Sequence, residues 1–102
     1  MNFLTHNDKN ICAVGSCFQG YISAEYFELK RIFGKALSGD MRKIDAYWKI
    51  EFPDGTIATI YNYKDGRKYL GKHGTPKSRI NIWHVGGFSE TAVTLIKSVL
   101  NK

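Results

Sequence analysis

Positively charged side chains and flat rings are concentrated together in one short part of this sequence. Segment 64–79 holds six basic residues and one acidic residue, so it carries +5 of the formal net charge of +6 on the 102-residue chain. The basic residues are Lys64, Arg67, Lys68, Lys72, Lys77 and Arg79, and the rings within or beside them are Tyr61, Tyr63, Tyr69, His73 and Trp83. Cations that hold phosphates, next to rings that stack on bases, are the groups that a nucleotide-binding site needs. The competing interpretation is a solvated loop whose lysines serve only solubility.

A second candidate site lies around Gly86 and Gly87. Ser89 follows these glycines as a typical helix cap, and the free N–H groups of a helix N-terminus favour anions. An ordinary strand-to-helix turn has the same sequence and is the more frequent of the two. Just before the glycines, strand alternation places Trp83 and His84 on opposite faces of a sheet. We expect Trp83 on the core side and His84 on the open side, where it can hydrogen-bond to a phosphate or a base edge.

Residues that bind metals or act as nucleophiles are too few and too scattered to predict an enzyme. A structural zinc site uses four nitrogen or sulfur ligands, usually in two close pairs. This chain offers one loose pair, Cys12 and Cys17. We therefore expect two ordinary buried thiols, no metal and no cofactor. A catalytic pair of Cys17 and His84 has no supporting motif, and metal-free phosphodiester cleavage through His84 stays open as an alternative.

A β-hairpin is the clearest element that would position these residues. Residues 44–52 alternate between apolar and polar side chains, which predicts a half-buried strand. The dipeptide at 54–55, Asp-Gly, is a strong hairpin signal, and residues 56–63 form the predicted return strand. A two-residue turn would place Phe52 opposite Ile57, Ile50 opposite Thr59, Trp48 opposite Tyr61 and Tyr47 opposite Asn62.

The remaining elements complete an α+β domain. We expect an extended segment at 10–18, a loop at 38–40, a short strand at 67–70, an exposed loop at 71–78 and a strand at 79–85. Apolar spacing predicts a helix over 23–34, capped by Ser23, and another after Gly87, with Phe88 and Val93 as a hydrophobic staple. This order suggests an antiparallel sheet of about four strands with two helices packed on one face. The other face would stay partly exposed, open to a ligand or a second subunit.

The length fits a single domain over residues 1–102, of which we expect 1–9 to be a flexible N-terminus. No apolar run approaches the ~20 residues that cross a bilayer, so we expect no membrane span. The first residues do not follow the pattern of a secretory signal. Two cysteines are fewer than a disulfide scaffold of this size would carry, which favours the reducing cytosol.

Three stretches resemble a widespread family of small bacteriophage proteins. They are residues 45–52, residues 54–64 with the sequence D-G-T-I-A-T-I-Y-N-Y-K, and residues 83–87 with W-H-V-G-G. The pattern is similar to that of phage anti-CBASS sponge proteins, which bind cyclic dinucleotide immune signals without cleaving them. The similarity covers about residues 26–100 of this chain. Residues 1–20, which include both cysteines, have no counterpart in it.

The resemblance implies a non-enzymatic protein that sequesters a cyclic dinucleotide, such as cyclic GMP–AMP, in the cytoplasm of the infected host. Such a protein needs cations, stacking rings and hydrogen bonds to base edges, but no nucleophile. The matching positions and the neighbouring cations give the candidate ligand-binding residues Tyr61, Asn62, Tyr63, Lys64, Arg67, Lys68, Tyr69, Lys72, Trp83, His84, Gly86 and Gly87. A chain this short has little concave volume, so we expect a homo-oligomer that shares the site between subunits.

Two other functions remain open at this point. One is a small RNA- or DNA-binding module that uses the exposed sheet face and the basic segment, with an affinity that falls steeply with salt. The other is an inhibitor of a host protein, with the basic segment docked on an acidic partner surface.

Overall fold

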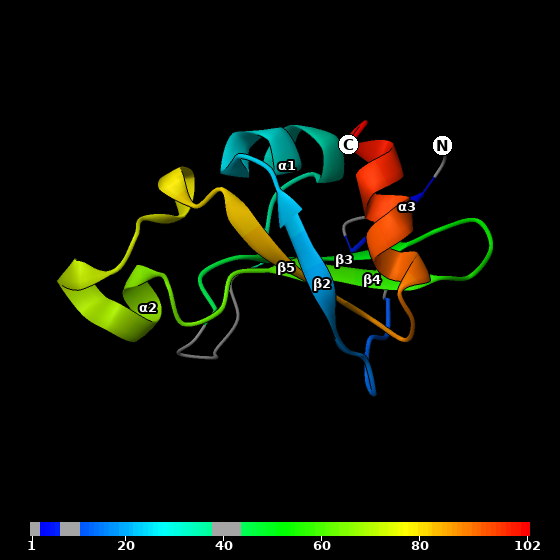
Figure 1. Cartoon of the computed structure of the whole chain (residues 1–102), viewed down its shortest axis with the longest axis horizontal. Helices are drawn as coiled ribbons and strands as arrows, with labels where there is room; N and C mark the ends of the chain where they lie inside the picture. Colours follow the sequence, from blue (N-terminus) through cyan, green and yellow to red (C-terminus); the bar gives the residue numbers. More distant parts are fainter. Residues whose placement is uncertain (1–2, 7–10, 38–43) are drawn as a thin grey trace.

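A five-stranded antiparallel sheet, in the order β1-β3-β4-β5-β2, organises the computed structural model (Figure 1). The structure describes residues 3–6, 11–37 and 44–102. The strands are β1 (Leu4–Thr5), β2 (Cys17–Ser23), β3 (Tyr47–Glu51), β4 (Ile57–Tyr61) and β5 (Ile82–Gly87). The helices are α1 (Tyr26–Phe33), α2 (Arg67–Leu70) and α3 (Thr91–Val99), with short 3-10 helices η1 (Gly71–His73) and η2 (Lys77–Arg79). The predicted α+β class is confirmed, with five strands and three α-helices in the described residues.

One face of the sheet carries the core. Alternate residues of the three central strands are fully buried there, namely Trp48, Ile50, Ala58, Ile60, Trp83 and Val85. Helix α1 contributes Leu29 and Phe33 to this core, and α3 contributes Ala92 and Ile96. The predicted period of two and the two predicted helical stripes are thus confirmed. The opposite face, which we call the open face, carries the partly exposed alternate residues.

The β3–β4 hairpin forms as predicted, but its register differs by one residue from the predicted one. Trp48 lies opposite Ile60 rather than Tyr61, and Tyr47 lies opposite Tyr61 rather than Asn62. The other predicted pairs shift in the same way. Because neighbouring residues of a strand face opposite sides, the observed register places Trp48 and Ile60 together in the core. It also brings Tyr47 and Tyr61 together on the open face.

Pro53 explains the change of register. In a two-residue turn at Asp54 and Gly55, the residue before the turn must donate its N–H to the partner strand, and proline has none. The closing pair of the hairpin is therefore one residue earlier on the first strand, where the N–H of Phe52, instead of that of Pro53, donates to the carbonyl of Thr56 at 2.9 Å. Gly55 completes the longer turn with φ at +88°, a conformation that glycine adopts without strain.

Strand β2 extends as far as Ser23, the first residue of the predicted helix. The predicted helix over 23–34 is shorter, because pairing with β5 holds the chain extended as far as Ser23. Tyr21, for example, lies opposite His84. Helix α1 therefore begins at Tyr26, after Glu25, and Ser23 does not cap it.

The N-terminal residues that the structure describes are ordered against the sheet rather than free. Leu4 and Thr5 form the edge strand β1 and pair with β3. The ring of Phe3 lies 5.2 Å from that of Phe33, between ring centres. The rest of the predicted flexible segment at 1–9, and the predicted loop at 38–40, fall outside the described residues. Among those that are described, no helix has the length and apolar character needed to span a membrane.

The C-terminal half differs from expectation at three points. Residues 67–70 form helix α2 rather than a strand, and the predicted strand at 79–85 begins only at Ile82. Gly86 and Gly87 extend β5 instead of ending it, because they pair with β4. A Cβ atom at Gly87 would lie 2.6 Å from the Cβ of Ala92, so the glycine lets α3 pack close to the sheet. Helix α3 then begins at Thr91, without a hydrogen bond from a capping side chain.

Candidate functional site

Four rings in register form a row across the open face. Tyr47 of β3 lies opposite Tyr61 of β4, Tyr61 lies opposite His84 of β5, and His84 lies opposite Tyr21 of β2. Residues directly opposite one another in an antiparallel sheet share a face, so the four side chains stand side by side. Tyr61 stacks on His84 with the ring centres 5.3 Å apart and the planes 23° from parallel. We call Tyr47, Tyr61, His84 and Tyr21 the aromatic row.

The next row of side chains along the strands has small residues in its middle. It runs from Lys49 through Thr59 and Gly86 to Phe18, again as directly opposed residues. Gly86 has no side chain, and a Cβ atom there would lie 2.5 Å from Oγ1 of Thr59 and 3.4 Å from Cε1 of Tyr61. The small residues Thr59 and Gly86 therefore leave a recess between Lys49 and Phe18, with the aromatic row along one side.

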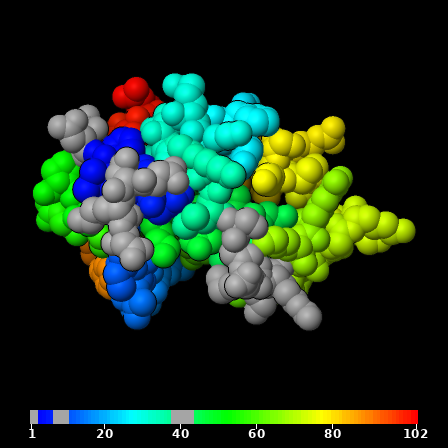
Figure 2. Space-filling view, turned by 180° about the vertical axis from the view of Figure 1, so that it is seen from behind, coloured from blue at the N-terminus to red at the C-terminus, as the bar shows by residue number. Residues whose placement is uncertain are grey.

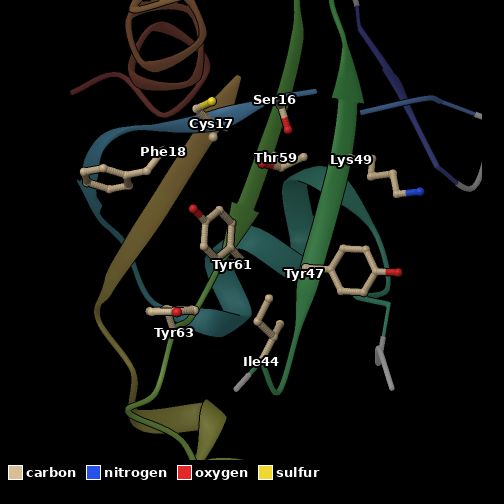
Figure 3. Close-up of a pocket in the computed structure, with 10 residues that line it drawn as sticks. Ser16, Cys17, Phe18, Ile44, Tyr47, Lys49, Thr59, Tyr61 and Tyr63 are labelled. Atoms are coloured by element: carbon tan, nitrogen blue, oxygen red, sulfur yellow. The ribbon is translucent and has the colours of Figure 1, made fainter. Parts of the chain in front are cut away.

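This recess is part of an open pocket of about 600 Å³, shown in Figure 3. Its lining residues are Ser16, Cys17, Phe18, Ile44, Tyr47, Lys49, Thr59, Tyr61, Tyr63 and Gly86. In Figure 3 Tyr61 and Tyr63 follow one another on the same side of the pocket, whereas the ring of Tyr47 projects from β3 away from them. The volume is that of a small-molecule site. Rings form much of its wall, and Lys49 is the one charged residue among those that line it.

His84 lies at the centre of the ring cluster on this face. Besides Tyr61, the rings of Tyr21, Phe18 and Tyr63 meet its imidazole nearly edge-on, with centres 4.9, 5.5 and 5.8 Å away. Nδ1 of His84 is buried and has no hydrogen-bond partner among the described residues. Burial lowers the pKa of the imidazole below its ordinary value of 6.5, against smaller opposing effects of Asp65 and the Tyr61 backbone. The neutral form of His84 is therefore favoured in the folded protein.

The lowered pKa of His84 predicts a loss of stability in acid. The unfolded imidazole takes up a proton near pH 6.5 and the folded one only at lower pH. The unfolded state thus binds more protons than the folded state below pH 6.5. The free energy of unfolding therefore decreases as the pH is lowered through this range. We expect the stability advantage of the wild type over His84→Phe to shrink between about pH 7 and 5. Urea denaturation of both proteins across this range measures it, and a constant difference would contradict the prediction.

Tyr61 is one of the hydrogen-bonding groups at the pocket wall. Burial raises the pKa of its phenol above the ordinary value of 10.0, and the nearby Tyr63, Tyr21 and Cys17 raise it further. The hydroxyl therefore keeps its proton at neutral pH. It can donate a hydrogen bond to an acceptor bound in the pocket.

Segment 64–79 folds into a small unit at one end of the molecule, which we call the basic lobe. It contains α2, η1 and η2 and protrudes from the sheet in Figures 1 and 2, in yellow-green and yellow. Lys64 links it to the pocket, because its Nζ lies 5.3 Å from the ring centre of Tyr63 and 5.7 Å from that of Tyr69. The predicted ligand-binding residues that lie on α2 and η1, and do not line the pocket, are Arg67, Lys68, Tyr69 and Lys72. The rings of the open face and most of the basic residues therefore occupy separate surfaces.

Three of the predicted ligand-binding residues have structural roles instead. The indole of Trp83 is fully buried and donates to the carbonyl of Ala24 at 3.0 Å, so it has no free face for a base. The side chain of Asn62 is also fully buried and all its polar atoms are bonded within the protein. Gly87 packs under α3. Tyr61, Tyr63 and Gly86 do line the pocket, and His84 supports its wall.

The two cysteines also differ from expectation. Both Cys12 and Cys17 are free and exposed rather than buried, and Cys17 lies at the pocket wall. Within the described part of the chain, no three His, Cys, Asp or Glu residues cluster as metal ligands would.

Sequence reasoning missed seven of the ten pocket residues, namely Ser16, Cys17, Phe18, Ile44, Tyr47, Lys49 and Thr59. The signal for two of them was present, because the alternation that buries Trp48 also places Tyr47 and Lys49 on the opposite face. Phe18 was out of reach, since its position depends on a bulge in β2 between Phe18 and Gly20. Extra residues of this kind re-aim side chains and leave no clear sequence pattern.

Neither a protein-family model nor a curated protein matches this sequence.

Proposed function

We propose that this protein binds a cyclic dinucleotide on its open face and sequesters it without cleaving it, as a phage anti-defence protein in the cytoplasm of the infected host. The observation that supports this proposal is the pocket of about 600 Å³ walled by Tyr47, Tyr61, Tyr63 and Phe18. Four rings around one recess suit a flat purine, whose faces stack on aromatic side chains whatever the base. The resemblance in residues 45–64 and 83–87 points to the same class of ligand.

One base and one phosphate of the ligand have matching groups in or beside the pocket. A base stacks on Tyr47 and Tyr61, and the protonated Tyr61 hydroxyl donates to an acceptor on it. Lys49 at one side and Lys64, next to Tyr63, are the cations closest to a bound phosphate. A charge-assisted hydrogen bond to phosphate is stronger than a neutral one. His84 is not among the residues that line the pocket, which favours retention of the ligand over hydrolysis.

The proposal includes a second copy of the chain. A cyclic dinucleotide has two bases and two phosphates, whereas one pocket is lined by a single cation, Lys49. Two pockets facing one another across a two-fold axis would supply matching groups for both halves of the ligand. We therefore propose a homo-oligomer in which two chains share each ligand.

Titration calorimetry of the full chain with a panel of cyclic dinucleotides tests this function. We expect saturable binding of at least one of them, with about one ligand for every two chains. Tyr61→Ala is expected to weaken that binding roughly 5- to 150-fold, because loss of one base–ring stack costs about 1–3 kcal/mol. Ligand recovered after heat denaturation of the protein should be intact.

Phe27→Ala is the matched control, since Phe27 is exposed on α1, on the covered side of the sheet. It should bind like the wild type. Absence of binding at micromolar protein would end the proposal, and recovery of a linear dinucleotide would turn it into an enzyme.

A further inference from the structure

The basic lobe is ordered although its short helices bury no side chain. Helix α2 and the 3-10 helices η1 and η2 contain no buried residue. Backbone contacts hold the lobe instead: the N–H of Thr75 donates to the carbonyl of Asp65 at 2.9 Å, and Gly66 and Thr75 form a β-bridge. A Cβ atom at Gly74 would lie 2.3 Å from the carbonyl oxygen of Gly66. The lobe thus has a defined shape without contributing side chains from these helices to the core.

A tight polar junction fixes the lobe to the sheet. Nδ2 of Asn62 donates to Oδ1 of Asp45 and to Oδ1 of Asp65, each at 3.0 Å. Oδ2 of Asp45 accepts the backbone N–H of Lys68 at 3.4 Å. A Cβ atom at Gly66 would lie 2.0 Å from Oδ1 of Asp45, so only glycine fits there. The only acidic side chain of segment 64–79, Asp65, therefore faces inward to Asn62.

The outer surface of the lobe is left strongly positive. Arg67, Lys72 and Arg79 are exposed, and no acidic residue in the described ranges forms a salt bridge with them. Like charges so close together repel one another, and a polyanion relieves that repulsion. Tyr69 and Leu70 are also exposed, at 46% and 44%. The lobe thus combines cations with an exposed ring, on a surface separate from the pocket.

We infer that the basic lobe is a second binding surface, for the phosphate backbone of single-stranded nucleic acid. Arg67, Lys72 and Arg79 contact phosphates, and Tyr69 offers a ring on which an unpaired base stacks. Single strands fit better than duplexes, because a lobe this small reaches few phosphates of a rigid helix whereas a flexible strand bends around it. An acidic protein lacks the bases that Tyr69 would hold.

Fluorescence anisotropy with a labelled oligothymidine of about 20 nucleotides tests this inference. Three phosphate contacts predict that the logarithm of the association constant falls with the logarithm of salt concentration with a slope of about −2. The double variant Arg67→Glu/Lys72→Glu should bind at least ten times more weakly, with a slope closer to zero. The double variant Lys30→Glu/Arg31→Glu on α1 is the control, because it makes the same change in net charge at two exposed residues.

Each further outcome has a defined meaning. Equal losses in the two double variants would show that only net charge matters and would overturn the inference. Tighter binding of a DNA duplex than of the oligothymidine would overturn the inference in favour of a duplex ligand. Tighter binding of polyglutamate of equal charge would overturn it in favour of an acidic protein partner. The lobe variant should keep its cyclic dinucleotide affinity and its melting temperature, and Tyr61→Ala should keep its oligothymidine affinity. The two surfaces can therefore fail or succeed independently.

Discussion

Replacing Asn62 by alanine is expected to lower the free energy of unfolding by about 3 kcal/mol or more, the largest loss that we expect for any polar residue within 3–6, 11–37 and 44–102. Its Oδ1 accepts the backbone N–H groups of Asp45 and Ala46 at 2.8 and 3.1 Å, and its Nδ2 bridges the carboxylates of Asp45 and Asp65. Alanine would leave these donors unsatisfied inside the protein and the two carboxylates without a donor between them. Chemical denaturation measures the loss.

Asn81→Ala is the matched control, because Asn81 is exposed. Its effect should stay within about 0.5 kcal/mol. The comparison also separates two roles for Asn62. A structural role predicts that folded Asn62→Ala binds cyclic dinucleotide like the wild type, whereas normal stability with lost binding would restore the role in ligand binding that the sequence suggested.

Trp83→Ala is expected to cost about 3–5 kcal/mol, the range for removal of a large buried aromatic side chain. Trp83 is fully buried, its ring centre lies 5.5 Å from that of Trp48, and its indole N–H donates to Ala24. Removal leaves a cavity beneath the middle of the sheet and a buried carbonyl without its donor. Because a domain of this size has only about 5–15 kcal/mol to lose, this variant will be close to unfolding.

Trp83→Phe keeps most of the ring and loses only the N–H and part of the volume. We expect a loss of about 2 kcal/mol in thermal or urea denaturation and an unchanged affinity for ligand. Tyr69→Phe, which also removes a polar group from an aromatic side chain but at an exposed position, should have little effect on stability. Weakened ligand binding by a stable Trp83→Phe protein would show that the indole reaches the pocket after all.

The sequence predicted the period of the central strands, and with it the core. Trp48, Ile50 and Ile60 are buried because the alternation of apolar and polar residues places them together on the apolar face of the sheet. This pattern can be recognised without any information about the rest of the chain. The predicted register was wrong because it took no account of Pro53, which lacks the N–H that a two-residue turn at Asp54 and Gly55 requires. The predicted extended segment at 10–18 covers only the start of strand β2, because the rest of the strand depends on pairing with β5, most of the chain away, and local propensity does not record such partners.

The site was predicted in its chemistry and only partly in its geometry. Tyr61, Tyr63 and Lys64 are close to one another as expected, because they are neighbours in sequence at the end of β4. Arg67 and Lys72 follow closely in sequence but belong to a lobe that turns away from the sheet. Tertiary contacts such as the junction at Asn62 decide the direction of the lobe, and these contacts cannot be predicted from local sequence. From sequence alone, an asparagine at the end of a strand is equally compatible with binding a ligand and with a structural role.

The exposed thiol of Cys17 offers a position for chemical labelling beside the pocket, because Cys17 is one of the residues that line it. Cys17 and Cys12 are the two cysteines of the chain, and only Cys17 lines the pocket. A Cys12→Ser protein therefore carries one alkylation site, placed where a bound molecule would shield it. Protection of this thiol from a small maleimide would report pocket occupancy in crude extracts, and disulfide-linked fragments would dock there without further engineering.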